Sequence, residues 1–278
     1  MHISRSLLGL AAIAAASVSL SAQGSNQAGG EFPIKDNSPE RTHHDAWLAG
    51  AVHAQANSAA WQAFAAQQGD GWMAHWTPAT GTPRAIFGPG LPIEDWRENT
   101  MVEARRHANA LLARRGELLG LGTSEFRESI SSRIGRQWSF VYDQYFRGLP
   151  VIGGRADVRV HMAGKVSMFG ASAWPIPADF DTVPTIEETT AVALAWQALG
   201  TSPNGVPQPA VSAAPRLVIW GDINASELAP FALAWEVSIS NVDKDGQGPI
   251  GRQYIDARTG RALNFSSDKH ECGLRGCT

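Results

Sequence analysis

The sequence predicts an α+β fold in which helices pack on antiparallel sheets. Residues 99–121 have apolar side chains at helical spacing, whereas several short segments alternate between apolar and polar residues. The 28 glycines and 16 prolines favour a loop-rich, strand-containing chain over a helical bundle. With 278 residues, 44% of them hydrophobic, the chain is long enough for one or two domains. We expect two successive sheet-plus-helix units.

The N-terminus predicts export. Arg5 supplies positive charge, residues 7–20 are apolar, and small residues up to Ala22 offer cleavage positions. Because this apolar stretch is too short to cross a bilayer of about 30 Å, we expect a cleaved signal peptide over residues 1–22. A buried N-terminal helix is the alternative. The polar residues 23–45 predict a disordered leader. We therefore expect a secreted protein whose mature chain has no membrane span.

The first expected unit begins with a helix and a hairpin. Residues 46–68 carry Ala, Gln and Trp at mixed helical spacing, which predicts a weakly phased helix. Residues 72–76 alternate as a strand does, and the turn-rich segment 77–83 follows. Residues 84–87 are the expected returning strand. We expect this hairpin to end at residues 88–90, which read Gly-Pro-Gly.

Residues 99–121 form the clearest predicted helix of the first unit. Its apolar face carries Ala104, Ala108, Leu111 and Leu112. Its arginines fall largely elsewhere; they are Arg105, Arg106, Arg114 and Arg115. Gly120 and Gly122 are expected to end the helix. A solvated arginine face is the simplest interpretation, and a surface for an acidic partner is the alternative.

Strands dominate from Trp138 onward. Residues 139–147 are rich in aromatic side chains, and residues 156–162 alternate between apolar and charged positions. Ala163-Gly164 is the expected turn, and residues 165–171 the returning strand. His161 falls on the solvent-exposed face of the strand over residues 156–162 and is expected to be an ordinary surface residue. We expect most of the ten tryptophans in the core and two or three exposed.

The second expected unit starts with a helix. Thr185 and Glu188 have the spacing of a capping box, residues 191–199 continue the helix, and Gly200 stands where a helix-ending glycine is expected. Residues 201–214 form the expected loop. The predicted strands are residues 217–220, 231–239, 252–256 and 261–265, with a turn at 257–260.

The two cysteines, Cys272 and Cys277, lie close to the C-terminus. Because export leads to an oxidising compartment, we expect them to form a disulfide. A disulfide that closes so short a loop adds roughly 2 kcal/mol to stability in the chain-entropy model. A zinc site that also uses His270 is the alternative, although three ligands are too few for a closed structural site.

Motifs that carry chemistry are missing from the sequence. The only His-Glu pair, His270-Glu271, is not followed by a histidine three residues later, so it is no zinc-protease motif. A Gly-x-Ser-x-Gly segment and a phosphate-binding glycine loop are also absent. The net charge of -3 argues against nucleic acid as a partner. We expect no enzyme activity, no catalytic residue, no cofactor and no metal.

One segment comes near a calcium loop. The residues at positions 1, 3, 5 and 6 of an EF-hand pattern are Asn241, Asp243, Asp245 and Gly246. Position 12 is Arg252, a cation where the main chelating carboxylate belongs. We therefore expect a polar hairpin turn. The adjacent His43 and His44 in the leader are expected to be solvated.

Residues 144–154 read Gln-Tyr-Phe-Arg-Gly-Leu-Pro-Val-Ile-Gly-Gly. They resemble the signature of the fungalysin/thermolysin propeptide (FTP) domain at Gln144, Gly148, Pro150, Val151, Gly153 and Gly154. The helix that ends in Leu118-Leu119-Gly120-Leu121 resembles the helix that precedes this signature. Residues 233–237 and 254–263 resemble the paired strands of a PepSY domain, with Asp256 and Gly260 in their turn. These positions are expected to be structural, through tight backbone geometry at the glycines and a restricted strand start at the proline.

The resemblance implies an FTP-like domain over 46–172, a PepSY-like domain over 173–267 and a C-terminal tail over 268–278. It also implies a function, because such propeptides assist the folding of a secreted zinc metalloprotease and occupy its cleft. The alternatives are a free-standing binding module with an unrelated partner and an enzyme of unrecognised type. The family's protease domain would begin soon after residue 265. A truncated gene, a fragment and a module that works alone all remain open.

Overall fold

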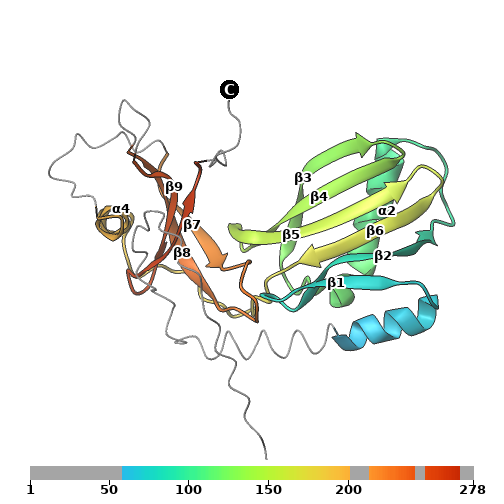
Figure 1. Cartoon of the computed structure of the whole chain (residues 1–278), viewed down its shortest axis with the longest axis horizontal. Coiled ribbons are helices and arrows are strands. Elements are labelled where there is room, and N and C mark those ends of the chain that lie inside the picture. Colours follow the sequence, from blue (N-terminus) through green and yellow to red (C-terminus); the bar gives the residue numbers. More distant parts are fainter. Residues whose placement is uncertain (1–57, 201–212, 242–247, 270–278) are drawn as a thin grey trace, which may run out of the picture. The chain divides into compact units, whose positions relative to one another are not determined.

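A computed structural model describes residues 58–200, 213–241 and 248–269, all of which lie in one compact unit, 37–278. The chain has a mixed α+β fold with a curled sheet and few helices (Figure 1). The strand order is β1-β2-β6-β5-β7-β8-β9-β10, and β3 joins this path through β4, which pairs with β5. The predicted signal peptide, the leader, residues 242–247 of the calcium-like segment and the two cysteines lie outside the described residues.

The first hairpin forms as predicted but extends further. Residues 58–68 are helical, and β1 (Met73–Thr77) pairs with β2 (Thr82–Pro92). The predicted end of the hairpin at residues 88–90 is wrong, because β2 continues through them to Pro92. The register between β2 and β6 shifts between Phe87 and Leu91, so the Gly-Pro-Gly residues form an irregularity inside the strand.

The predicted helix 99–121 is two helices. The first, α2 (Met101–Arg114), begins at Thr100, whose side chain accepts from the amide of Glu103. It ends where Arg115 leaves helical geometry, with φ -111° and ψ 17°, and α3 (Gly116–Leu119) follows. Gly120 closes α3 in the left-handed conformation, with φ 65°. The predicted apolar face of α2 is confirmed as buried, and its members are Ala104, Ala108, Leu111 and Leu112.

The sequence analysis missed β3 (Glu125–Ile134). This strand pairs on one side with β4 (Gln137–Phe146), and most of its residues are exposed. An exposed edge strand needs no apolar face, so its side chains show no clear alternation. The pairing is irregular between Glu128 and Ile130, whose partners Tyr142 and Val141 are adjacent on β4. The strand therefore does not keep the two-residue period of a regular strand.

The next hairpin consists of β5 (Leu149–His161) and β6 (Lys165–Ser172). The predicted alternation is confirmed, since Ala156, Val158 and Val160 are fully buried. These residues form one core with α2, α3, Phe140 and Phe169. The ring of His161 accepts a hydrogen bond from the amide of Ala163 at 3.1 Å in the predicted turn.

The predicted capping box is wrong. α4 (Glu188–Ala198) begins after Glu187, which makes no side-chain capping bond. The amides of Thr185 and Ile186 instead donate to the carbonyl oxygen of Ala257, at 2.9 and 2.8 Å. Because these bonds hold the two residues against the last hairpin, the helix starts later than the sequence pattern indicates. Gly200 has φ 69°, as expected for a residue that follows a helix.

The remaining strands match the predicted segments. They are β7 (Arg216–Gly221), β8 (Phe231–Ser240), β9 (Ile250–Asp256) and β10 (Ala262–Ser267), each antiparallel to the next. α4 packs on β8 and β9 in a second core that includes Trp196, Leu233, Trp235 and Ile255. Every described tryptophan is buried or half-buried, which contradicts the expectation that two or three are exposed.

Strand pairing crosses the predicted domain boundary at residue 172. Val151 of β5 pairs in parallel with Ile219 of β7. Both side chains belong to a third buried cluster, which also includes Phe146, Trp174 and Phe231. The division into an FTP-like and a PepSY-like unit stays a prediction, because one hydrogen-bonded strand order runs through both segments.

Candidate functional site

The signature segment Gln144–Gly154 forms the end of β4, a turn and the start of β5. Phe146 pairs with Leu149, so the turn consists of Arg147 and Gly148 alone. Both have positive φ angles, 48° and 82°. Two-residue hairpins favour this geometry because its twist matches that of the flanking strands, and glycine adopts it without strain.

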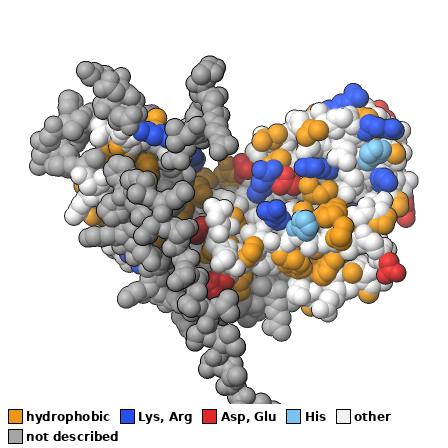
Figure 2. Space-filling view, viewed as in Figure 1, with side chains coloured by type: hydrophobic (Ala, Val, Ile, Leu, Met, Phe, Trp, Pro, Cys, Tyr) orange, Lys and Arg blue, Asp and Glu red, His pale blue; other side chains and the backbone are white. Residues whose placement is uncertain are grey.

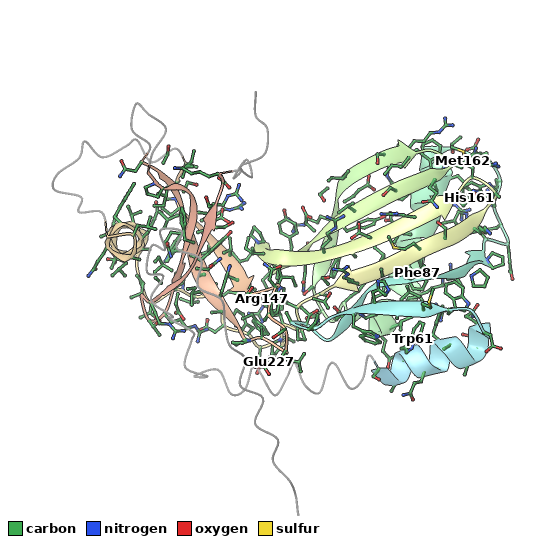
Figure 3. All side chains as sticks on the ribbon, in the orientation of Figure 1. Trp61, Phe87, Arg147, His161, Met162 and Glu227 are labelled. Atoms are coloured by element: carbon green, nitrogen blue, oxygen red, sulfur yellow. The ribbon has the colours of Figure 1, made fainter. Side chains whose placement is uncertain are left out.

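Arg147 is the one non-glycine with a positive φ among the described residues. Figure 3 labels Arg147 near the start of β5. Its guanidinium donates to the carbonyl oxygens of Ala178 at 2.7 Å and Phe180 at 3.4 Å, and it lies over the ring of Phe146. These contacts offset the strain of the left-handed backbone. They also attach the turn to the segment that leads toward α4.

Gln144 connects three parts of the chain. Its side chain is fully buried in β4. Its Nε2 donates to the Ser124 hydroxyl at 2.8 Å and to the Trp174 carbonyl at 2.9 Å, and its Oε1 accepts from the Trp174 amide at 2.9 Å. A buried carboxamide is stable only when such partners are present. Gln144 therefore holds the loop before β3 and the segment after β6 in place.

The two glycines of the signature leave room for neighbours. A Cβ on Gly154 would overlap Gln144 Oε1 and lie 2.7 Å from Gln144 Cβ. Gly153 has φ 75°, and a Cβ there would lie 3.0 Å from the Cβ of Ile223. Gly154 is thus required by space, whereas Gly153 is required chiefly by its backbone conformation.

Trp174 extends this network toward β7 and β8. It is 1% exposed, and its indole nitrogen donates to the carbonyl of Ile152 at 3.1 Å. A Cβ on Gly221 would lie 2.5 Å from the indole ring, so β7 approaches Trp174 closely. The ring of Phe231 packs against it with centroids 6.1 Å apart.

Asp256 and Gly260 lie in a different place, the turn between β9 and β10. The carboxylate of Asp256 is buried and accepts from the amides of Arg258 at 2.8 Å and Thr259 at 2.9 Å. Gly260 has φ 74°, and a Cβ there would lie 2.9 Å from the Leu194 side chain of α4. This turn therefore packs directly under α4.

Sequence reasoning missed two partners of the signature, Ser124 and Trp174. Trp174, which precedes Pro175, gave a weak indication of a core position, because a large aromatic side chain in a loop usually packs into a core. Nothing in the sequence pattern singles out Ser124, whose contact with Gln144 depends on the pairing of β3 and β4.

Three of the four arginines of the predicted arginine face have partners within the chain, and two of them contact other elements. Arg105 forms a bidentate ion pair with Glu128 of β3, and the shortest distance, from Nε to Oε2, is 2.8 Å. Arg115 lies over the ring of Phe64 at 5.2 Å. The ion pair compensates the charge of Arg105, whereas the ring contact leaves the charge of Arg115 in place.

Arg106 belongs to a compact polar cluster on α2. It pairs with Glu103 at 2.8 Å and with Asp95 at 2.9 Å. The Nε2 atom of His107 lies 3.2 Å from Glu103, and the ring of Trp96 packs against His107. The hydrogen bond from Arg106 lowers the pKa of Glu103 to about 2, although burial acts in the opposite direction.

A second polar cluster lies on β7, β8 and β9. Glu236 is buried and accepts from Arg216 at 2.7 Å and from the Tyr254 hydroxyl at 3.1 Å. Burial, followed by the charge of Glu236, raises the pKa of Tyr254 to about 12. Each polar group in this cluster has a partner, so the cluster is satisfied as it stands.

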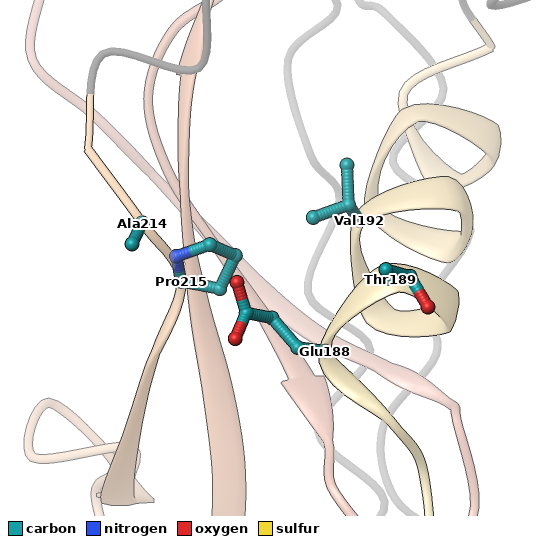
Figure 4. A pocket seen from close by; sticks show the side chains of 5 residues that line it. All are labelled: Glu188, Thr189, Val192, Ala214 and Pro215. Carbon is teal, nitrogen blue, oxygen red and sulfur yellow. The ribbon is translucent and has the colours of Figure 1, made fainter.

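An open groove lies between α4 and the chain before β7. It is lined by Glu188, Thr189, Val192, Ala214 and Pro215 (Figure 4). Across the described residues, no group of three or more His, Cys, Asp or Glu side chains is placed to hold a metal ion. The helices in this same part of the chain are all too short or too polar to cross a membrane.

Comparison with known proteins gives a remote similarity. No protein-family profile matches the chain. It is 28% identical over 178 residues to a transglutaminase-activating metalloprotease of Streptomyces mobaraensis. The matched part is 63% of this chain but only 22% of that relative. A solved structure, the Bacillus megaterium YpeB C-terminal domain, aligns with a TM-score of 0.34 and 13% identity, over 78% of this chain and 97% of that one.

Proposed function

We propose that this chain is a non-catalytic, propeptide-type module that binds a secreted zinc metalloprotease, assists its folding and blocks its cleft. The observation that carries the proposal is the 28% identity to a metalloprotease over 178 residues. That stretch accounts for 22% of the relative, as expected for a part that accompanies a protease domain. The signature at Gln144–Gly154 supports the same function.

The geometry of the signature fits a module that acts through its surface. Gln144, Gly154 and Trp174 are buried and are used for hydrogen bonding and close packing. They hold three segments in a fixed arrangement. A rigid surface loses little conformational entropy when it binds, which favours stable docking onto a partner. A surface that binds the native protease but not its unfolded chain also stabilises the native state.

Titration of a protease with the full chain tests the proposal. The probe is the mature transglutaminase-activating metalloprotease, and the readout is hydrolysis of a peptide substrate. We expect slowed hydrolysis at concentrations well below tens of micromolar, that is, on the order of 1 μM. The heat-unfolded chain is the control and should not inhibit. Undiminished hydrolysis at tens of micromolar would contradict the proposal and favour a binding module with an unrelated partner.

The same assay addresses the absence of catalysis. The chain alone, without the protease, should not hydrolyse the substrate, and a chelator should abolish all activity in the mixture through the zinc of the protease. Turnover by the chain that survives both a chelator and repeated purification would identify an enzyme instead.

A further inference from the structure

The sheet of strands β1 to β6 has two different faces. One face packs on α2 and α3 through Ala156, Val158 and Val160. The other face, here called the open face, carries the alternate residues of the same strands. Arg155 and Arg159 of β5 and His75 of β1 are exposed there. In Figure 2, hydrophobic side chains lie beside arginine, lysine and histidine side chains over this sheet.

Strand register places four side chains of the open face in one line. Met73 of β1 is opposite Phe87 of β2, Phe87 is opposite Met168 of β6, and Met168 is opposite Arg159 of β5. We call these four residues the Met–Arg row. Because neighbouring strands lie about 4.8 Å apart, the row is about 15 Å long. It is long enough to contact one loop or strand of another protein.

The apolar part of the row is accessible and partly fixed. Met73 is 56% exposed, and Phe87 and Met168 are half-buried. The ring of His75 packs edge to face against Phe87 with centroids 5.2 Å apart, which restricts the orientation of Phe87. Methionine side chains adapt to different apolar shapes and are common at binding surfaces. This part of the row therefore fits an apolar side chain of a partner.

The charged end of the row lacks a carboxylate. The neighbouring Arg155 pairs with Asp157, and Arg127 on β3 pairs with Glu125. Arg159 is exposed and makes no ion pair with any described residue. An arginine binds a carboxylate with two parallel hydrogen bonds, which gives strength and orientation. The partner that complements the row thus places a carboxylate next to its apolar side chain.

We propose that the Met–Arg row is the surface that docks onto the protease, which rests on the proposed function. An apolar side chain of the protease packs on Met73, Phe87 and Met168, and a neighbouring Asp or Glu binds Arg159. A lipid surface fits less well, because anionic membranes attract clusters of four or more cations. The row has one unpaired arginine, and the carboxylates of Asp157 and Glu125 lie on the same face.

Binding of the full chain to the mature transglutaminase-activating metalloprotease tests this surface by titration calorimetry. The variants are Met73→Ser and Arg159→Glu. Their matched controls are Val183→Ser, which replaces an apolar side chain that is 69% exposed elsewhere, and Arg114→Glu on α2. We expect each row variant to raise the Kd about tenfold or more and each control to leave it within about twofold. Melting temperatures should stay near that of the wild type, because all four side chains are on the surface.

The outcomes separate the two proposals. If the wild type binds and the row variants bind equally well, the docking surface lies elsewhere while the proposed function stands. If the wild type does not bind the protease, both proposals fail. Binding to vesicles of phosphatidylserine and phosphatidylcholine that is lost in Arg159→Glu would overturn the protein partner in favour of a membrane.

Discussion

Gly154 leaves the space that the buried carboxamide of Gln144 occupies. The two residues lie on neighbouring strands, and a Cβ on the glycine would overlap the Oε1 atom that accepts from Trp174. The first and last residues of the signature are therefore parts of one arrangement. The glutamine supplies the hydrogen bonds, and the glycine leaves room for its side chain.

Gly154→Ala should destabilise the protein by about 1–3 kcal/mol, because the added methyl group forces the Gln144 side chain out of its position. Urea unfolding measures the change. Gly116→Ala is the matched control, since a Cβ there would meet no atom within 4 Å and its φ is not positive. We expect that control to be neutral or to stabilise α3 by up to about 1 kcal/mol. Equal stability of Gly154→Ala and the wild type would contradict the account of the signature.

A double-mutant cycle makes the coupling of the two residues explicit. In a Gln144→Ala background the carboxamide is gone, although the Cβ at 2.7 Å remains, so adding Gly154→Ala should cost less than it does in the wild type. We expect an interaction energy of about 0.5–3 kcal/mol between the two changes. Additive effects would mean that the two positions act independently.

Gln144→Leu should destabilise the protein by about 1–3 kcal/mol for the buried group that it leaves without a partner. That group is the amide of Trp174, at 2.9 Å from the carboxamide, because the carbonyl of Trp174 keeps a second donor, the amide of Ile176 at 2.9 Å. Gln197→Leu on the exposed side of α4 serves as the control and should change stability by less than about 0.5 kcal/mol. An unchanged unfolding midpoint in Gln144→Leu would rule out this role.

Asp256→Ala should cost about 1–3 kcal/mol, because it removes a buried carboxylate that accepts from two amides of the turn. Asp222→Ala is the matched comparison, since the Asp222 carboxylate accepts from the Asn224 amide at 3.0 Å in an exposed turn. Water can replace that acceptor, so the loss should be smaller. Thermal unfolding of both variants measures the two losses of stability. Equal losses would show that burial of the Asp256 carboxylate has no effect.

Acid should destabilise the protein through Glu103. The folded-state pKa of about 2 lies below the ordinary value of 4.5. The contribution of this carboxylate to the free energy of unfolding is therefore complete above about pH 4.5. It is lost as the pH falls toward 2, because the unfolded chain then binds a proton that the folded chain does not. Glu103→Gln should flatten the dependence of unfolding free energy on pH between 4.5 and 2. Parallel curves for the wild type and the variant would exclude this origin.

Much of the fold could be predicted where burial imposes a period on the sequence. The buried face of α2 and the alternation of Ala156, Val158 and Val160 follow directly from packing on a core. The strand β3 could not be found this way, because its exposed side chains are under no such constraint. The start of α4 was misplaced because long-range hydrogen bonds from Thr185 to Ala257 override a local capping pattern.

The site was predictable only in part, for a similar reason. The glycines and the glutamine of the signature were recognisable as a pattern, but Trp174, the partner of Gln144, lies 30 residues downstream and has no fixed spacing. The Met–Arg row likewise combines residues from four strands. Their alignment depends on the register of three strand pairs, which one sequence does not specify.

Refolding of a denatured zinc metalloprotease tests the central claim most directly. The mature transglutaminase-activating metalloprotease is unfolded in guanidinium chloride and diluted with or without the full chain. After the chain is removed by limited proteolysis, recovered peptidase activity is measured. A folding and docking module should raise the recovered activity severalfold, and the heat-unfolded chain should not. Equal recovery with native chain, unfolded chain and buffer would contradict the account.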